Sequence, residues 1–344
     1  MERLKMEFIK KSAPQYKANL HCHSVLSDGK LTPEELKKVY KDNGYSVLAI
    51  TDHEYPCDHS DLTDEDFIML TGYEAYIRPG IGKCVYDRFG AEIHINLLAR
   101  DPHNVSYVCY NDCYCKYVKD QKIKDGFKKV GSSEPRRYDV EYVNGFLRDA
   151  KENGYICAHN HAYWSMEEFS YLEGYDGFFS MEMCNYSSFL LNGTEYNAHI
   201  YDHLSRHGKR IFCHSADDNH NKAPFDSPYC DSFGGFTMVM ADELTYSSVF
   251  SALEQGNFYS SMGPLFHSIT IENGKIHIET DPVRQITVFN GSKTPPHVIG
   301  SKDAPLTSAD FDMPEKYTYL RFGILDFEGK HADTRAYFPD EIEK

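Results

Sequence analysis

The chain has 344 residues, and its 52 acidic and 36 basic side chains give a formal net charge of −16. A chain of this length can form one large barrel with a small appendage, or about two or three ordinary domains. The negative charge argues against a protein that tracks long nucleic acid, because the polyanion would be repelled. No apolar stretch is long enough to span a bilayer, and residues 1–6 do not resemble a secretory signal. We therefore expect the ten cysteines to be reduced thiols in a cytoplasmic protein.

Strand-like runs alternate with helical patterns over most of the chain. The strand-like runs end near residues 20, 50, 70, 98, 157, 183 and 213. Thr32-Pro33-Glu34-Glu35 is a capping box with proline at the first helical position, and Ser165-Met166-Glu167-Glu168 is a second capping box. Segments 138–153 and 194–207 are also expected to be helical, because a glycine follows each. The alternation predicts an α/β fold with a parallel sheet, and about seven units favour a closed or nearly closed barrel.

The pattern changes after Gly263-Pro264. Short alternating runs follow, several of them separated by glycine, asparagine or proline, and they predict a small antiparallel β unit. We therefore expect a barrel domain at residues 1–264 and a small β-rich C-terminal subdomain at residues 265–344. The subdomain contains four histidines without a carboxylate cluster, which are expected to be structural or exposed: His267, His277, His297 and His331.

Histidine or a carboxylate follows most strand-like runs of the expected barrel. The residues at these ends are His21, His23, Asp28, Asp52, His53, Glu74, His94, His159, His161, Glu182, His214, Asp218 and His220. A parallel barrel brings the carboxyl ends of its strands to one face, where side chains distant in sequence can meet. Imidazole and carboxylate together bind zinc, manganese or iron, and a carboxylate such as Glu74 can bridge two ions. The sequence therefore predicts a multinuclear metal site.

These motifs resemble the PHP (polymerase and histidinol phosphatase) superfamily. The resemblance rests on His21-Cys22-His23-Ser24, Ser27-Asp28-Gly29, Thr51-Asp52-His53, Glu74, the run at His94, Ala158-His159 and Asp218-Asn219-His220. It extends from about residue 18 to residue 220, and segments 258–264 and 319–329 resemble the barrel end and the β appendage of stand-alone phosphoesterases of the superfamily. The resemblance implies a distorted (βα)7 TIM-like barrel with a small C-terminal antiparallel β subdomain. It also implies two to three divalent ions, which would be zinc, manganese or iron.

The resemblance further implies which residues hold each ion. The three sets would be His21, His23, Glu74 and Asp218 for one ion, Glu74, His94 and His159 for a second, and Asp28, His53 and His220 for the third. Some members have histidine where this chain has Asp28. An aspartate there shifts the third set toward oxygen ligands, which makes manganese or iron as suitable as zinc.

Three residues are candidates for a catalytic role: His161, Asp218 and His220. Asn160 stands where many members of the superfamily have proline, and His161 follows it. The imidazole of His161 could donate a proton to a leaving group or bind phosphate. It could equally orient another ligand or be exposed.

Four further residues are candidates for substrate binding. Glu182 and Asn185 resemble a Glu-x-x-Asn pattern of this branch, and we expect them to contact substrate or a metal ligand. Arg136 and Arg137 belong to the basic segment 116–137, which could cover the site and bind an anionic substrate. That segment could also be an ordinary solvated face.

His199, His203 and His207 are spaced four residues apart within the expected helix 194–207. This spacing places them on one side of a helix, where they could clamp a metal ion. Because this stripe contains no carboxylate of its own, a solvated stripe is the favoured interpretation.

Together these residues predict a metal-dependent phosphoesterase acting on a small phosphomonoester or nucleotide. A metal-bridging hydroxide would attack phosphorus, and the cations would stabilise the charge that develops on oxygen. The alternatives are a 3′–5′ exonuclease on short single strands, a carbamate or ester hydrolase using the same centre, and a catalytically silent metal-bound binding module. The expected partner is a small phosphorylated substrate, with no long nucleic acid and no membrane, and the oligomeric state is left open.

Overall fold

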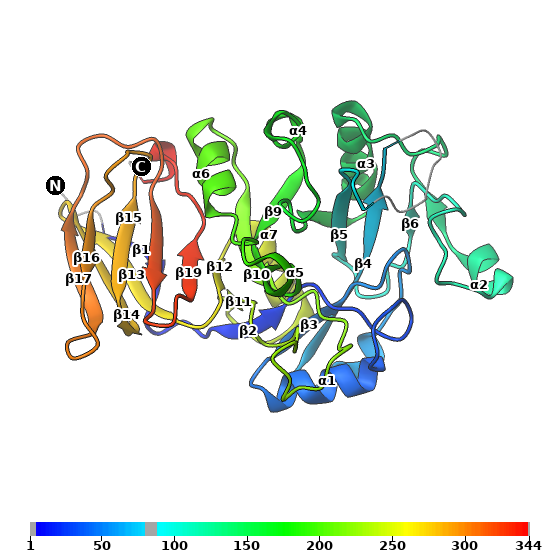
Figure 1. The fold of residues 1–344 in the computed structure, drawn as a ribbon, viewed down its shortest axis with the longest axis horizontal. Helices are drawn as coiled ribbons and strands as arrows, with labels where there is room; N and C mark the ends of the chain where they lie inside the picture. The colour runs from blue at the N-terminus through cyan, green and yellow to red at the C-terminus, as the bar shows by residue number, and fades with distance from the viewer. Residues whose placement is uncertain (1–4, 80–87, 343–344) are drawn as a thin grey trace.

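The computed structural model describes residues 5–79 and 88–342, and a long mixed sheet dominates it (Figure 1). In order across this sheet, the thirteen strands are β10 (Phe212–Ala216), β9 (Phe178–Asn185), β8 (Tyr155–His159), β5 (Ile93–Ala99), β4 (Ile68–Ile77), β3 (Val47–Ile50), β2 (Tyr16–Asn19), β11 (Phe236–Val239), β12 (Phe258–Ser261), β19 (His331–Thr334), β18 (Arg321–Leu325), β15 (Gln285–Phe289) and β16 (His297–Ile299). A four-stranded sheet has the order β1 (Lys5–Ile9), β13 (Phe266–Glu272), β14 (Lys275–Val283) and β17 (Leu306–Asp312). The short strands β6 (Tyr107–Val108) and β7 (Lys129–Val130) pair with each other.

The described helices are short and follow or connect the strands. They are α1 (Pro33–Asp42), α2 (Gln121–Gly126), α3 (Val140–Glu152), α4 (Phe169–Gly174), α5 (Tyr186–Asn192), α6 (Ala198–Arg206), α7 (Tyr246–Gln255) and α8 (Pro339–Ile342), with a 3-10 turn at Ser60–Leu62. The capping box that opens α1 is confirmed, because the Glu35 amide donates to Thr32 Oγ1 and the Thr32 amide donates to the Glu35 carboxylate. The second expected capping box is wrong. α4 begins only at Phe169, and the side chain of its N-cap residue, Glu168, makes no capping hydrogen bond.

The strand directions differ from the expected all-parallel arrangement. β2, β3 and β4 are parallel to one another, as are β8, β9 and β10. β5 stands between these two groups and is antiparallel to both β4 and β8. Beyond β2, the pairings through β11 and β12 to β16 are all antiparallel. The α/β class is therefore confirmed, whereas the parallel direction is wrong for β5.

The closed barrel is not confirmed. Within residues 5–79 and 88–342, no hydrogen-bonded ladder joins β10 to β11, so β10 is one end of the long sheet. The two strands are nevertheless neighbours, because Thr237 Oγ1 donates to the Ser215 carbonyl at 2.8 Å. The sheet therefore curves until β10 reaches β11, but side-chain contacts rather than a ladder join them.

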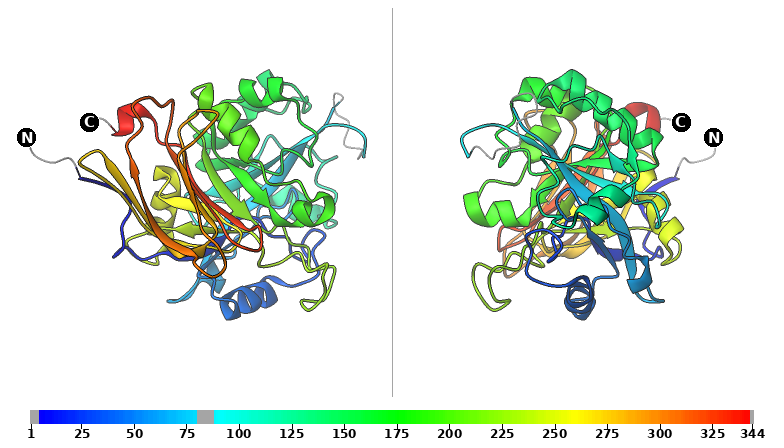
Figure 2. Two further views of the ribbon diagram at one scale, coloured as in Figure 1. Left: turned by 60° about the vertical axis from the view of Figure 1, so that its left-hand side comes forward. Right: turned by 90° about the vertical axis from the view of Figure 1, so that its right-hand side faces the viewer.

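Several connections cross the expected boundary at residue 264. β1, at the start of the chain, pairs with β13, and the left view of Figure 2 shows it beside the C-terminal strands. β12 pairs with β19 and so carries the long sheet from one expected domain into the other. One hydrophobic core cluster also contains Leu36 of α1 together with Ile276 of β14 and Phe322 of β18. The two expected domains share both backbone pairing and core.

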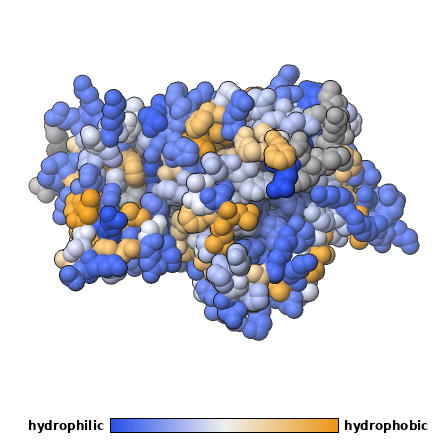
Figure 3. Space-filling model, in the orientation of Figure 1, coloured by the Kyte–Doolittle hydropathy of each residue, from blue (hydrophilic) through white to orange (hydrophobic). Residues whose placement is uncertain are grey.

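The surface is consistent with the polar composition. The face drawn in Figure 3 is mostly hydrophilic, with hydrophobic residues in separate patches. Among the described residues, no helix combines the length and the apolar character needed to cross a bilayer. The expectation of reduced thiols throughout is wrong for Cys113, which is disulfide-bonded. Eight other cysteines are free: Cys22, Cys57, Cys109, Cys115, Cys157, Cys184, Cys213 and Cys230.

Candidate metal centre

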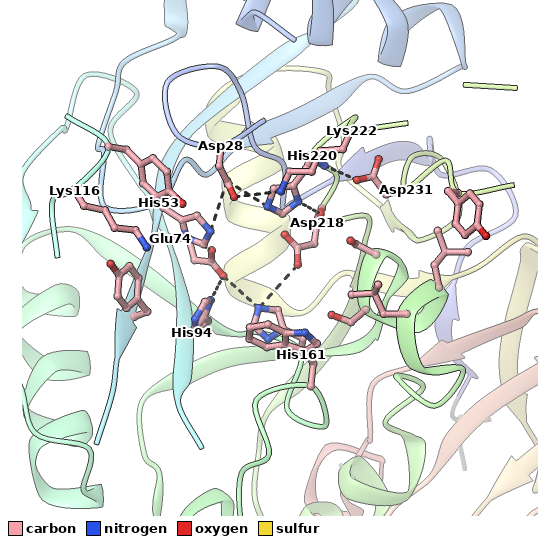
Figure 4. A pocket seen from close by; sticks show the side chains of 18 of the residues that line it. Asp28, His53, Glu74, His94, Lys116, His161, Asp218, His220, Lys222 and Asp231 are labelled. Carbon is pink, nitrogen blue, oxygen red and sulfur yellow. Dashed lines mark hydrogen bonds and ion pairs between the residues drawn. The ribbon is translucent and has the colours of Figure 1, made fainter. Parts of the chain in front are cut away.

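A pocket of about 830 Å³ opens where the ends of β2, β3, β4, β5, β8 and β10 meet (Figure 4). Seven residues singled out from the sequence line it: Asp28, His53, Glu74, His94, His161, Asp218 and His220. His21 and His23 lie just behind this lining and are fully buried. The pocket therefore gathers side chains from residue 21 to residue 220, as the strand-end pattern predicts.

The local backbone explains how these residues reach one point. His53 follows β3 and forms a β-bridge with Glu74 on the neighbouring strand β4. His23 follows β2, and its amide donates to the carbonyl of Asn219 at 3.0 Å, which holds the first loop against the segment after β10. His94 stands near the start of β5 rather than its end. Because β5 runs antiparallel, its start lies at the same edge as the ends of β4 and β8.

Glu74 is the centre of the cluster. Its carboxylate is buried, with Oε1 3.0 Å from Nδ1 of His94 and 3.3 Å from Nε2 of His21. Its Oε2 lies 2.7 Å from Nδ1 of His53 and 3.5 Å from Nε2 of His23. One carboxylate in contact with four imidazoles has the geometry of a bridging ligand.

Asp218 and Asp28 are the other two carboxylates of the cluster. Asp218 Oδ1 lies 2.9 Å from Nε2 of His23 and 3.2 Å from Nε2 of His21. Asp28 Oδ1 lies 3.3 Å from Nε2 of His220 and 3.9 Å from Nε2 of His53. Three compact ligand groups result, and each shares a residue with another: His21, His23 and Glu74; His53, Glu74 and His94; and His23, Asp28, His53 and His220.

The donor set fits divalent metal ions. Buried side-chain atoms normally find hydrogen-bond partners, yet Asp28 Oδ1, His53 Nδ1 and Glu74 Oε2 are buried without one. His53 Nδ1 and Glu74 Oε2 approach closely without the angles of a hydrogen bond. Lone pairs that converge in this way are suited to bind cations, and the mixture of nitrogen and oxygen suits zinc, manganese or iron.

Electrostatics inside the cluster shift the pKa values of the candidate ligands in different directions. Burial opposes ionisation of Glu74, but His94, His53 and His21 hold its pKa well below the usual range. Burial, with His220 and His53 close by, lowers the pKa of His23 to about 4 and keeps its imidazole neutral. Burial also disfavours the cationic form of His94, yet Glu74 and Glu92 raise its pKa to about 10. A bound cation would displace that proton, since only the neutral imidazole is a ligand.

His159 lies away from the cluster, whereas His161 lies beside it. The structure does not bring His159 to the cluster, because its Nε2 lies 2.6 Å from Glu167 Oε1 and its ring packs against Tyr175 and Phe178. The imidazole of His161 points into the pocket, with Nε2 3.4 Å from Glu74 Oε1 and 4.0 Å from Asp218 Oδ2 (Figure 4). The structure therefore places His161 rather than His159 among the candidate ligands, which differs from the assignment that the resemblance implies.

Backbone strain accompanies two residues of the cluster. His161 and Asp218 have positive φ values of 22° and 53°, which non-glycine residues adopt at a cost of about 1–3 kcal/mol each. The His161 amide donates to Glu182 Oε2 at 2.7 Å, and the Asp218 amide donates to the His21 carbonyl at 3.0 Å. These contacts hold both side chains toward the pocket.

Glu182 and Asn185 position metal-site residues and do not line the pocket. Glu182 Oε1 accepts from His21 Nδ1 at 2.8 Å, which leaves His21 Nε2 directed at Glu74 and Asp218. The Asn185 amide group donates to Glu182 Oε2 at 2.8 Å and to Asp218 Oδ2 at 3.2 Å. They contact His21 and Asp218, which are candidate metal ligands.

Neither arginine expected to bind substrate lines the pocket. Arg136 is fully buried and donates to Glu54, to the Tyr76 carbonyl and to the Cys109 carbonyl. Arg137 lies at the surface and pairs with Glu134 and Asp139. The structure therefore does not place either arginine at the pocket, as that prediction expected, and of the basic side chains of segment 116–137 only Lys116 lines it.

Several residues of the pocket wall lie outside the sequence motifs. The cationic and aromatic ones are Tyr76, Arg78, Tyr117, Trp164, Lys222 and Tyr229. Arg78 lies one residue beyond β4 and Trp164 three residues beyond His161, so a search along the same strand ends could have found them. Tyr229 lies in the loop between β10 and β11 and carries no such signal.

Residues 19–111 match the family model of the PHP domain. This segment of the chain is therefore similar to the PHP domain. The matched segment contains six residues of the cluster: His21, His23, Asp28, His53, Glu74 and His94. The family resemblance stated from the sequence motifs is thereby confirmed.

Three solved structures are similar to this chain at low sequence identity. A two-domain protein from Bacteroides vulgatus that contains a predicted PHP-like metal-dependent phosphoesterase is 14% identical, with 96% of each chain covered and a TM-score of 0.47. A candidate metal-dependent phosphoesterase from Bifidobacterium adolescentis is 15% identical over 62% of this chain and 91% of its own, with a TM-score of 0.37. An amidohydrolase from Chromobacterium violaceum, with bound sulfate and no metal, is 18% identical over 62% of this chain and 93% of its own, with a TM-score of 0.38. No curated protein matches the chain.

Proposed function

We propose that this PHP-domain protein is a metal-dependent phosphoesterase that hydrolyses a small phosphomonoester or nucleotide. The observation that carries the proposal is the set of three linked ligand groups around Glu74 at the bottom of one pocket. Its volume of about 830 Å³ lies within the range of small-molecule sites, roughly 300–1,000 Å³. The net charge of −16 still disfavours long nucleic acid as the substrate.

The geometry supports two to three ion sites. His21, His23, Glu74 and Asp218 would hold one ion, and Asp28, His53 and His220 another. Glu74 and His94 would hold a third, with His161 in place of His159. Zinc, manganese or iron bound there would supply Lewis acidity and lower the pKa of a coordinated water.

The side chains around the mouth suit a phosphorylated substrate. Lys222 Nζ lies 3.5 Å from Asp28 Oδ2, at the edge of the ion cluster. Lys116 Nζ lies over the rings of Tyr76 and Tyr117 on the opposite side (Figure 4). We propose that these two cations bind the phosphoryl group or a second anionic group, the role first expected of Arg136 and Arg137.

The aromatic side chains of the pocket favour a second candidate function, which would also be hydrolysis of a phosphate ester. Tyr117, Trp164 and Tyr229 line the pocket, and aromatic side chains can stack on nucleobases. A 3′–5′ exonuclease on short single strands therefore remains the alternative function.

The cytoplasmic location stays a prediction. The disulfide at Cys113 counts against the argument for it from reduced thiols.

The decisive experiment combines metal analysis with a substrate panel. Purified protein is loaded separately with zinc, manganese or iron and assayed on phosphomonoesters, nucleotides, labelled short oligonucleotides and a carboxyl ester. We expect phosphomonoester hydrolysis that disappears in Glu74→Gln, together with the loss of metal from His21→Ala. His267→Ala is the matched control, because this exposed histidine pairs with Asp281 far along the chain from the cluster.

The other outcomes separate the alternatives. Cleavage of oligonucleotides alone would favour the exonuclease, and cleavage of the carboxyl ester alone would favour the ester hydrolase. Stoichiometric metal without any turnover would indicate a silent binding module. Full metal content in His21→Ala, combined with no hydrolysis of any phosphate ester by the wild-type protein, would overturn the proposal.

A further inference from the structure

The exposed histidine stripe of α6 has a partner that the sequence does not reveal. His203 lies in the last turn of α6 and His207 follows as its C-cap residue, four positions later. Glu173, in the last turn of α4, lies with its Oε1 2.5 Å from Nε2 of His203. Figure 1 shows α4 and α6 as neighbours on one side of the molecule. None of these three residues lines the pocket around Glu74, whose ligand groups are called the PHP cluster below.

We propose that Glu173, His203 and His207 form a separate binding site for a single zinc-class ion that links α4 to α6. One ligand atom from each residue lies within 4.8 Å of the others. Two histidines four positions apart on a helix, together with a carboxylate, are an established ligand set for zinc. This inference does not depend on the proposed phosphoesterase activity.

The hydrogen bonding of His207 supports the ligand role. Its Nδ1 lies 2.8 Å from the His203 carbonyl oxygen, which can only accept, so Nδ1 carries the proton. The lone pair is therefore on Nε2, the nitrogen that remains available to a metal. Metal-binding histidines commonly donate their other N–H to a backbone carbonyl in this way.

The distance between Glu173 Oε1 and His203 Nε2 would have to increase only slightly for both atoms to bind one zinc ion. Two ligands of a tetrahedral zinc ion stand about 3.3 Å apart when each bond is about 2 Å long. The two atoms are now 2.5 Å apart and share a proton that the ion would replace. Glu173 and His207 are exposed and His203 is half-buried, so the site is open to solution and the side chains can separate.

α4 is a helix that such an ion would stabilise. It has six residues, and its N-cap residue Glu168 makes no side-chain capping hydrogen bond. Helices of this length are marginal without tertiary contacts. An ion held between Glu173 and the two histidines would fix its last turn to α6.

The test counts metal ions on the full-length protein. Wild-type protein and variants are equilibrated with Zn²⁺ alone, freed of unbound metal and analysed for zinc per chain. We expect His203→Gln, His207→Gln and Glu173→Gln each to bind one zinc ion fewer than wild type. His199→Gln is the matched control, because His199 is an exposed histidine of the same helix that lies outside the ligand group, and it should retain the ion.

Two further measurements separate this site from the PHP cluster and from misfolding. A variant with His53→Ala and Asp218→Ala should keep the zinc ion that Glu173→Gln removes. Hydrogen exchange in α4 should slow when Zn²⁺ is added to wild type or to His199→Gln, but not when it is added to Glu173→Gln. Equal zinc content in Glu173→Gln, His207→Gln and wild type, with all three folded in metal-free buffer, would overturn the proposal.

Discussion

His159 and His161 stand two positions apart, and the structure gives them different neighbours. Alternate residues of a strand share a face, which favours His159 and His161 together on one side. β8 ends at His159, however, and His161 lies beyond it with a positive φ value. The change of backbone conformation turns His161 toward Glu74 and leaves His159 facing Glu167.

We expect the two substitutions to have different effects. His161→Ala should lower the metal content and the activity, because the imidazole lies 3.4 Å from Glu74 Oε1. His159→Ala should keep the metal and lower the free energy of unfolding by about 1–3 kcal/mol, because it removes a buried hydrogen bond to Glu167. Metal analysis and denaturant unfolding of both variants check this. Loss of metal from His159→Ala with His161→Ala unaffected would restore the assignment made from the motif.

At the scale of elements, a buried ion pair fixes the segment that precedes α3. Arg136 Nη1 lies 2.5 Å from Glu54 Oε1, and both side chains are fully buried. The same guanidinium donates to the Tyr76 carbonyl on β4 and to the Cys109 carbonyl after β6. Tyr107 donates to the second oxygen of Glu54 at 2.5 Å, so every charge in this group has a partner. Arg136 therefore joins three chain segments beside the pocket.

Arg136→Ala and Lys116→Ala should separate stability from substrate binding. Removing Arg136 leaves Glu54 buried without its counter-charge, so we expect a loss of about 3–5 kcal/mol in the free energy of unfolding. Lys116→Ala should leave stability nearly unchanged and raise KM for a phosphorylated substrate, because its ammonium group lies at the pocket. Thermal unfolding and steady-state kinetics provide the two readouts. A raised KM with normal stability in Arg136→Ala would support the original substrate-binding assignment.

The contact between β19 and the segment before α6 should depend on pH. Burial lowers the pKa of His331, whose ring stacks on Tyr196 at 4.1 Å, while Asp333 and Asp326 oppose that shift and Arg321 adds to it. The unfolded chain then binds the proton more readily than the folded one, so the stability provided by neutral His331 is lost as pH falls below about 6.5.

We expect wild type to be more stable than His331→Gln at pH 7.5, with the difference shrinking toward pH 5. Urea unfolding of chelator-treated protein across this range measures it without contributions from bound metal. A difference that stays constant or grows as pH falls would contradict the neutral, stacked histidine.

At the scale of the whole molecule, backbone pairing and the hydrophobic core cross the expected boundary at residue 264. Arg321 of β18 adds a buried polar link, because its guanidinium donates to Asp202 of α6 and to Asp333 of β19. The division into residues 1–264 and 265–344 remains a proposal about sequence organisation. The shared sheet and core indicate that the two parts depend on each other for folding.

We therefore expect a single cooperative unfolding transition for the intact chain. A chain truncated after residue 264 should fail to fold, because the edge of β12 and the core residues that pack against β13 and β14 would be exposed. Calorimetry of the intact protein and near-UV circular dichroism of the truncated one check these outcomes. Two separate transitions, or a folded truncated chain, would show that the parts are independent.

Much of the candidate site could be predicted from the sequence because its candidate ligands lie within or just after short apolar runs. His21, His23, Glu74 and Asp218 all lie where the motifs place them. The direction of β5 could not be predicted, since hydrophobic alternation is the same in parallel and antiparallel strands. Burial of Arg136 could not be predicted either, because its partner Glu54 is 82 residues away in the chain.

The sequence by itself determined the resemblance to the PHP domain, the α/β class and most of the candidate metal ligands, because these depend on residue types and local spacing. Only the tertiary structure decided that His161 rather than His159 faces the pocket, and that Lys116 and Lys222 rather than the two arginines flank it. It also brought Glu173 to the histidines of α6. The physical reason is that side-chain direction and contacts between distant segments follow from how the whole chain packs, and local sequence patterns do not contain that information.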